Sequence, residues 1–153
     1  MKVVTRFAPS PTGYLHLGSA RTAIYNYLYA KKNKGKYLIR IEDTDKKRST
    51  QAAIEAIHDG LNWLQINSSE KIVYQSQQIA SHVKVAFDLL KKGYAYKCYL
   101  SAEELNELRM KSRKKGIPIR SPWRNKINNK ENKNFVLRLK MPETGLTTIN
   151  DLV

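Results

Sequence analysis

The residues best suited to chemistry gather in one stretch, residues 3–22. A β-branched run opens it, and Pro-Ser-Pro-Thr-Gly then forces a turn, because two fixed φ angles and a glycine disfavour both strand and helix. After Gly18 the apolar residues recur at the spacing of a helix with one buried face, at Ala20, Ala23, Ile24, Tyr27 and Leu28. A helix start offers unpaired N–H groups and the positive end of the helix dipole, which bind phosphate or carboxylate. The stretch therefore predicts a strand, a tight loop and a helix arranged around an anion.

A second set of candidate residues is acidic and follows the next predicted strand. The first helix should end near Gly35, residues 36–41 favour a strand, and Glu42, Asp43 and Asp45 come directly after it. Strand, helix and strand within about forty residues predict a βαβ unit with parallel strands and a right-handed crossover. Because ligands bind outside the carboxyl ends of such strands, the loop that carries His16 should face the same crevice as Glu42. For Thr44-Asp45, an acidic turn that caps the next helix is an equal alternative.

Three short motifs carry a resemblance to a known family. The loop holds neither a Walker A motif nor a G-x-G-x-x-G fingerprint. It contains Arg-Phe-Ala-Pro-Ser-Pro-Thr-Gly over residues 6–13 and His-Leu-Gly-Ser over residues 16–19, and Arg-Ile-Glu-Asp-Thr-Asp follows over residues 40–45. These motifs resemble the class I aminoacyl-tRNA synthetases, whose first signature is His-Ile-Gly-His, and the glutamyl-tRNA synthetases in particular. Glutaminyl enzymes usually carry Pro-Glu-Pro-Asn where this chain has Pro-Ser-Pro-Thr.

The resemblance covers nearly the whole chain and implies its fold. It predicts an α/β protein with the first half of a Rossmann-like class I synthetase nucleotide-binding fold, residues 1–80. Residues 81–153 would begin the inserted α/β domain that binds the tRNA acceptor stem. The family's second signature, Lys-Met-Ser-Lys-Ser, does not occur, and Lys111-Ser112 is only a superficial echo of it on a predicted helix. The 153 residues alone are therefore expected to be incomplete for catalysis.

The implied reaction is activation of L-glutamate by ATP with Mg²⁺, giving glutamyl-adenylate, and transfer to the 3′ end of tRNA-Glu. In-line attack on the α-phosphate needs positioning and charge stabilisation rather than covalent help. The resemblance assigns ATP binding to Pro11, Thr12, His16 and Gly18, and catalysis to His16, Thr12, Gly18 and Ser19. It assigns glutamate binding to Arg6, Ala8, Pro9, Ser10 and Glu42. Structural alternatives are a surface ion pair for Arg6, a turn role for Ser10 and loop packing for His16.

The charge of the chain points to an anionic partner. The formal net charge is +15, and residues 91–140 alone carry net +11. A basic patch of this kind suits nucleic acid, here tRNA-Glu and, in some family members, tRNA-Gln. A Lys/Asn/Ile-rich composition that merely solvates the surface is an equal alternative on charge alone.

Cysteine content and hydropathy bound the compartment and the cofactors. Cys98 is the only cysteine, which excludes an internal disulfide and suits a reducing cytoplasm. No apolar run approaches the roughly 20 residues that a membrane span needs. Many relatives bind zinc through a Cys-x-Cys pair at this place, but Leu100 replaces the second cysteine, so we expect no zinc or other bound metal. A monomer is usual for the family.

The sequence leaves three alternative functions. A paralogue that charges queuosine-modified tRNA is one, although such paralogues usually keep the zinc cysteines. A non-catalytic fragment that only binds tRNA acceptor stems is another. A small nucleotidyltransferase of the same superfamily is disfavoured, because its loop has a different pattern, Gly-x-Phe-Asp-x-x-His-x-Gly-His.

The remaining pattern predicts further elements. A helix from about Gln51 should bury Ile54, Ile57, Leu61 and Leu64, with Trp63 in the core and His58 exposed or hydrogen-bonded. A polar connection, 65–73, leads to Tyr-Gln-Ser at 74–76, where the family's following arginine is replaced by Gln78. A helix over 77–92 should bury Ile79, Val83, Ala86, Phe87 and Leu90. The pattern then predicts a strand over 94–100, followed by a capping box at Ser101 and Glu104 that opens a helix to about Lys115. An irregular stretch follows over 116–134, in which 125–134 should be mobile. The prediction ends with a strand over 135–140 and another from 147 to 153.

Overall fold

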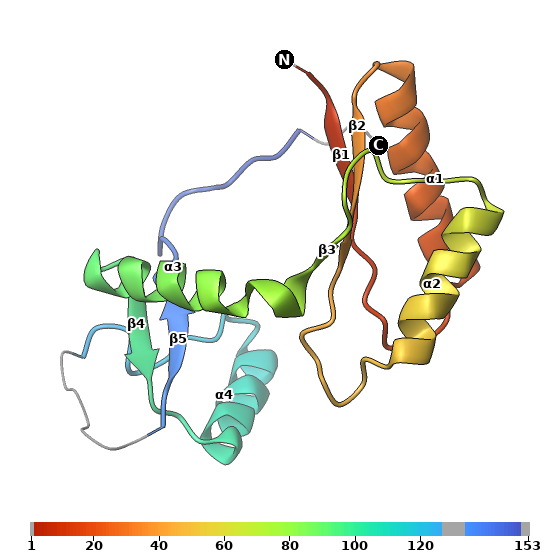
Figure 1. Cartoon of the computed structure of the whole chain (residues 1–153). Helices are drawn as coiled ribbons and strands as arrows, with labels where there is room; N and C mark the ends of the chain where they lie inside the picture. Colours follow the sequence, from red (N-terminus) through yellow and green to blue (C-terminus); the bar gives the residue numbers. More distant parts are fainter. Residues whose placement is uncertain (1, 127–133, 151–153) are drawn as a thin grey trace. The chain divides into compact units, whose positions relative to one another are not determined.

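The structure is a computed structural model that describes residues 2–126 and 134–150 (Figure 1). The chain divides into two compact units, Met1–Ala80 and Ser81–Val153. Both units mix helices with short strands, so the prediction of an α/β protein is confirmed. Within the described ranges, none of the helices has the length and apolar character needed to cross a bilayer.

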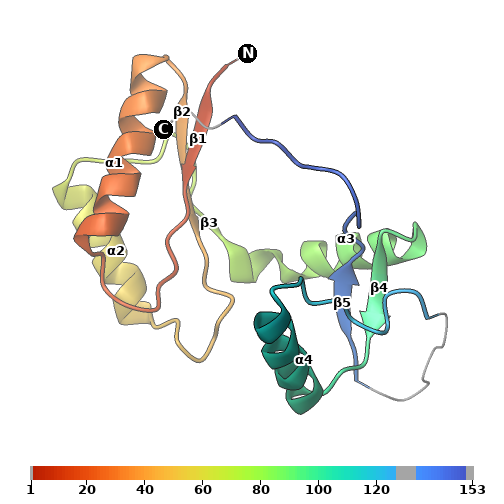
Figure 2. The same cartoon turned by 180° about the vertical axis from the view of Figure 1, so that it is seen from behind.

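The first unit is built on a three-stranded parallel sheet in the order β1-β2-β3. Its strands are β1 (Val4–Phe7), β2 (Lys36–Ile41) and β3 (Val73–Tyr74). Helix α1 (Leu17–Lys32) connects β1 to β2, which confirms the predicted βαβ unit, and α2 (Gln51–Trp63) follows β2. The views from opposite sides show α1 and α2 on the same side of this sheet (Figures 1 and 2). Strand β3 was not predicted, and it lies at the end of the stretch that was expected to be a polar connection. Two residues are too few to produce the alternating pattern from which a strand is predicted.

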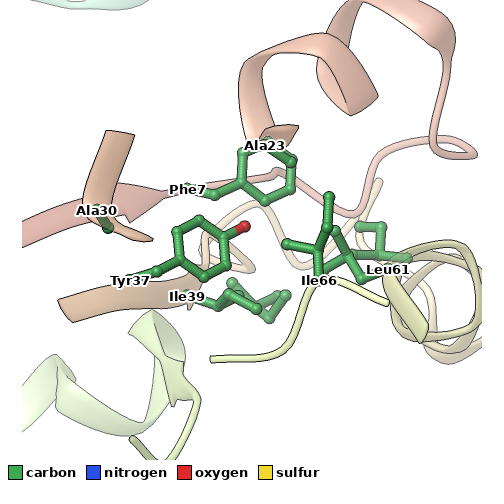
Figure 3. Packing of buried hydrophobic residues seen from close by; sticks show 9 residues of the cluster. Phe7, Ala23, Ala30, Tyr37, Ile39, Leu61 and Ile66 are labelled. Atoms are coloured by element: carbon green, nitrogen blue, oxygen red, sulfur yellow. The ribbon is translucent and has the colours of Figure 1, made fainter. Parts of the chain in front are cut away.

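The core lies between this sheet and the two helices (Figure 3). Every second residue of β2 is buried, and the core side chains are Phe7, Ala23, Ala30, Tyr37, Ile39, Ile41, Ile57, Leu61 and Ile66. Two sequence predictions are wrong here: Leu28 is 54% exposed and Trp63 is 83% exposed. At about 100° per residue, Leu28 lies some 140° around the helix from Ala23, whereas Ala30 returns to the buried row.

Trp63 is exposed for a similar reason. It stands at the last position of α2, two residues beyond the buried Leu61 and therefore on another side of the helix. The chain then turns at Gln65, whose φ is +55°, and Ile66 enters the core in its place.

The turn after α1 packs closely against the start of β1, and this contact fixes the alignment of β1 with β2. Lys36 N–H donates to Val3 O at 2.9 Å. A Cβ added to Gly35 would lie 2.3 Å from that same oxygen, so only glycine fits at this position.

Helix α3 (Ile79–Lys91) begins at the end of the first unit, after a short 3₁₀ helix (Gln75–Gln78), and its remaining residues belong to the second unit. The second unit also contains an antiparallel pair of strands, β4 (Ala95–Cys98) and β5 (Val136–Leu139). Helix α4 (Ala102–Lys115) starts with the predicted capping box, in which Ser101 Oγ accepts from Glu104 N–H and Glu104 Oε2 accepts from Ser101 N–H. It ends at Gly116, whose φ of +62° suits glycine.

Two predictions for this unit are wrong. Helix α3 buries no residue, and Ile79, Val83 and Phe87 are 40–48% exposed. A two-stranded sheet offers too little apolar surface to cover a helix, and the buried hydrophobic residues described in this unit are Ala95 and Cys98. Residues 147–150 form no strand, because no other described strand pairs with them. Residues 151–153, and most of the stretch predicted to be mobile, lie outside the described residues.

Candidate functional site

A hollow of about 570 Å³ opens at the loop between β1 and α1. The end of β1 and the loop line it with residues 6–10 and 12–16, together with Ser19 and Thr22 of α1 and Ile57 of α2. The hollow thus brings together seven of the predicted site residues, which are Arg6, Ala8, Pro9, Ser10, Thr12, His16 and Ser19. Pro11, Gly18 and Glu42 are not among the lining residues. Pro11 belongs to the loop, and the main-chain N–H groups of Gly18 and Glu42 donate hydrogen bonds to it.

His16 starts helix α1 with its own side chain. Its Nδ1 accepts the N–H of Gly18 at 3.1 Å, and its main-chain N–H donates to Ser19 Oγ, also at 3.1 Å. Because Nδ1 is occupied as an acceptor, the neutral ring carries its proton on Nε2. The exposed imidazole can therefore offer an Nε2–H donor to an anion at the helix start. The sequence did not reveal this cap, because histidine is not a usual N-cap residue.

Ser19 completes the cap and has both hydrogen-bonding roles filled by His16. Its hydroxyl accepts from His16 N–H and donates to His16 O at 2.9 Å. Gly18 is tightly placed, because a Cβ there would lie 3.1 Å from both Cε1 and Nδ1 of the His16 ring. A side chain at position 18 would therefore require the imidazole to move by a few tenths of an ångström.

Main-chain hydrogen bonds fasten the loop to the rest of the unit. Glu42 N–H, just after β2, donates to Pro9 O at 2.9 Å, and Thr50 N–H donates to Pro11 O at 3.4 Å. Pro11 itself is among the fully buried side chains. Leu15 lies against helix α2, where a Cβ added to Gly60 would come within 2.7 Å of Leu15 Cδ2.

Charged side chains meet beside the hollow at the carboxyl end of β2. Glu42 Oε1 lies 2.5 Å from Arg40 Nη2 and 3.8 Å from Arg6 Nη1. All three side chains are between a third and a half exposed. A carboxylate and a guanidinium placed side by side match the ammonium and carboxylate groups of an amino acid. The sequence-based list missed Arg40, although the alternation of β2 places it on the face of the sheet that turns away from the core.

The two acidic residues that follow Glu42 have structural partners. Asp43 accepts from Ser76 N–H at 2.8 Å and from the Ser76 hydroxyl at 2.5 Å. Although burial raises the pKa of Asp43, these hydrogen bonds prevail and hold the pKa below its ordinary value. Asp45 pairs with Arg48 Nε at 2.7 Å within a turn, whereas Thr50 caps helix α2. His58 was predicted to be exposed or hydrogen-bonded, and the second alternative holds, because its Nε2 lies 2.9 Å from Tyr74 Oη.

The second unit presents positive charge but no described metal cluster. Four basic side chains of α4 are exposed, namely Lys111, Arg113, Lys114 and Lys115. Among the residues that the structure describes, no group of three or more His, Cys, Asp or Glu side chains could hold a metal ion. Cys98 is buried, and its Sγ lies 3.3 Å from Ser121 Oγ. Burial raises the pKa of the Cys98 thiol, but hydrogen bonds from Ser121, the Leu100 main chain and Arg138 outweigh it and lower the pKa overall.

Comparison with known proteins adds independent information. The glutamate–tRNA ligase of Caulobacter vibrioides is 52% identical over 151 residues, which are 99% of this chain and 32% of that protein. Glutamate–tRNA ligase 1 of Sphingopyxis alaskensis is 50% identical over 153 residues, which are 99% of this chain and 31% of that protein. The chain thus spans about a third of the length of the curated relatives that it matches.

Solved structures agree in fold. The glutamate-tRNA synthetase from Elizabethkingia anophelis superposes with a TM-score of 0.82 at 32% identity, over 99% of this chain and 35% of that chain. A glutamate tRNA ligase from Elizabethkingia meningosepticum, solved in complex with its amino acid, gives a TM-score of 0.76 at 33% identity, over 93% of this chain and 33% of that chain. The Rossmann-like class I fold predicted from the loop motifs is therefore confirmed.

Residues 2–153 match the family described as tRNA synthetases class I (E and Q), catalytic domain. This match covers both units of the chain and agrees with the motifs at the loop and at the end of β2. The chain belongs to the class I tRNA synthetases for glutamate and glutamine, as part of their catalytic domain.

Proposed function

We propose that the complete protein containing this chain is a glutamate–tRNA ligase. It would activate L-glutamate with ATP and Mg²⁺ to glutamyl-adenylate and transfer the glutamyl group to the 3′ end of tRNA-Glu. The observation that carries the proposal is the charged pair of Arg6 and Glu42, which stands beside a hollow at the start of helix α1. The names of the relatives, glutamate–tRNA ligase in both organisms cited, support the same substrate.

The nucleotide would bind at the loop and helix start. His16 would donate from Nε2 to phosphate oxygens, and Thr12 would add a hydroxyl donor from the wall of the hollow. Gly18 would let adenosine approach the main chain, and Pro11 would hold the loop from beneath. Ser19 would support His16 through the cap rather than touch the reacting atoms.

The amino acid would bind at the carboxyl end of the sheet. Arg6 would bind a substrate carboxylate with two parallel hydrogen bonds, and Glu42 would accept from the ammonium group. Ala8, Pro9 and Ser10 would form the wall between these two charges. With a small side chain at position 8 and a hydroxyl at position 10, this wall fits a short polar substrate.

The second unit, residues 81–153, would begin the domain that binds the acceptor stem. Its exposed Lys and Arg side chains on α4 provide the positive charge that a tRNA backbone requires. We further propose that the complete enzyme is a cytoplasmic monomer without zinc, and that it charges tRNA-Glu and, depending on its anticodon-binding part, tRNA-Gln.

The test is exchange of pyrophosphate into ATP by the complete protein, measured with glutamate, glutamine and aspartate, with and without tRNA. We expect exchange that needs glutamate and increases with tRNA-Glu. His16→Asn should lower the rate, while His82→Asn, the same change at an exposed histidine of helix α3 that does not line the hollow, should not. Absence of glutamate-dependent exchange would refute the proposal, and charging of only queuosine-modified tRNA would identify the paralogous activity instead.

A further inference from the structure

Arg40 is the charged residue of the site that neither the loop motif nor the proposed substrate contacts explain. It stands on β2 between Ile39 and Ile41, both buried in the core. Its side chain therefore lies on the other face of the sheet, as does that of Leu38 two residues earlier. Arg6 of β1 pairs in register with Leu38, so its side chain lies on this face too. Two guanidinium groups thus approach the same carboxylate from neighbouring strands.

The two arginines contact Glu42 unequally. Arg40 Nη2 lies 2.5 Å from Glu42 Oε1, which is a short, charge-assisted hydrogen bond. Arg6 Nη1 lies 3.8 Å from the same oxygen, which is too far for a hydrogen bond. Arg40 is therefore the residue that holds the carboxylate, whereas the guanidinium of Arg6 keeps its donors.

The placement of Arg40 is costly to the fold. Its Nε is buried without a hydrogen-bond partner among the described residues. A buried donor without a partner destabilises the folded state, so an arginine at this position needs a compensating role. Among the described residues, the hydrogen bond and ion pair formed by its side chain both go to Glu42, so the compensating role involves that carboxylate.

We propose that Arg40 is a positioning residue for the amino-acid site. By binding Oε1 of Glu42, it fixes the plane of the carboxylate and leaves Oε2 to accept from the substrate ammonium group. It also satisfies the carboxylate, so that Arg6 remains available for a substrate carboxylate. The three side chains together carry one net positive charge, which offsets the net negative charge of glutamate. The inference rests on the proposed function and adds a residue to it.

The experiment measures glutamate activation by the complete protein and three variants. Arg40→Met keeps the length of the side chain without its charge, and Arg40→Lys keeps the charge without the planar fork. Arg48→Met is the matched control, because Arg48 also binds a carboxylate, Asp45 Oδ2 at 2.7 Å, but on an exposed turn. Each protein is assayed for the KM of glutamate, the KM of ATP and its thermal unfolding temperature.

We expect Arg40→Met to raise the KM of glutamate by about ten- to a hundredfold, the loss associated with one hydrogen bond to a charged group. The KM of ATP should change less than about twofold, and Arg40→Lys should recover part of the loss. Inhibition by glutarate, which has both carboxylates but no ammonium group, should weaken less than the binding of glutamate, because only glutamate also uses the carboxylate of Glu42 that Arg40 positions. In a Glu42→Gln background, Arg40→Met should add little, because it acts through Glu42.

Several results would overturn the proposal. An unchanged KM of glutamate in Arg40→Met would do so. Equal losses of affinity for glutamate, ATP and glutarate would also do so, because they indicate a merely structural role. If Arg40→Met does not fold, Arg40→Lys provides the test, because the proposal requires it to weaken the binding of glutamate more than the binding of glutarate. A wild-type protein without glutamate-dependent exchange would instead refute the proposed function, so the two failures can be told apart.

Discussion

Tyr37 gives the sharpest test of how the first unit is held together. The side chain is 2% exposed, and its hydroxyl has no hydrogen-bond partner among the described residues. Figure 3 shows the ring in the core near Phe7, Ile39 and Ile66. Burial raises the pKa of Tyr37 far above its usual range. Both observations describe a polar group that folding removes from water without compensation.

Removal of this hydroxyl should stabilise the protein. A buried hydroxyl without a partner costs about 1–3 kcal/mol, so Tyr37→Phe should raise the free energy of unfolding by about 1 kcal/mol or more. Phenylalanine keeps the edge-to-face contact with Tyr27, whose ring centre lies 5.6 Å away. The control is Tyr74→Phe, which removes a hydroxyl 2.9 Å from His58 Nε2 and should cost about 0.5–1.5 kcal/mol.

The assay is unfolding by urea, in which a change in midpoint at constant slope reports a change in stability. The midpoint should rise for Tyr37→Phe and fall for Tyr74→Phe. Alkaline pH adds a second readout. Because burial raises the pKa of Tyr37, the folded state holds the phenolic proton more tightly than the unfolded state does. The free energy of unfolding should therefore fall as the pH rises above about 10, and the phenylalanine variant should lack that fall. A lowered midpoint for Tyr37→Phe would refute the reasoning.

Three further substitutions test other contacts. Gly35→Ala should lower the free energy of unfolding by about 1–3 kcal/mol, because the new Cβ meets Val3 O at 2.3 Å, and urea unfolding measures this. Gly18→Ala should displace the His16 ring and raise the KM of ATP in the complete protein by about tenfold, as measured by pyrophosphate exchange. Asp43→Asn should be less stable at neutral pH, with the difference disappearing as the pH falls below 3.8, because the folded-state pKa of Asp43 is lowered and its stabilisation is lost on protonation.

Gly13→Ala is the control for Gly35→Ala. A Cβ added to Gly13 would meet nothing within 4 Å, so this change should leave the free energy of unfolding unchanged. Equal losses of stability at positions 13 and 35 would contradict the crowding argument, and so would an unchanged KM of ATP in Gly18→Ala. For Asp43→Asn, a stability difference that does not decrease as the pH falls below 3.8 would show that the hydrogen bonds to Ser76 do not depend on the charge.

The sequence predicted the arrangement of the first unit because its signals are local. Proline and glycine mark the loop, β-branched residues mark β1, and the alternation of β2 determines which of its side chains enter the core. The same local patterns placed the capping box at Ser101 and the end of α4. Residues whose role depends on neighbours in the chain were therefore the ones best predicted.

The errors concern residues whose role depends on distant partners. Trp63 and Leu28 are apolar, but their exposure depends on which side of each helix meets the sheet. Helix α3 has a clear apolar row, yet burial also requires a surface to cover that row. Alternation along β2 places Arg40 on the outer face of the sheet, on the same side as Glu42 two residues later, but the pattern alone does not show that their side chains bind each other.

The fastening of the loop between β1 and α1 affects the thermodynamics of any ligand that it binds. Glu42 and Thr50 hold Pro9 and Pro11 through main-chain bonds, and Leu15 rests on α2 at Gly60. The loop therefore loses its conformational entropy when the chain folds rather than when a ligand arrives. Calorimetry should accordingly show a small entropic penalty for nucleotide binding. A larger residue at Gly60, on a helix outside the loop, should make that penalty greater because it loosens the loop's anchor.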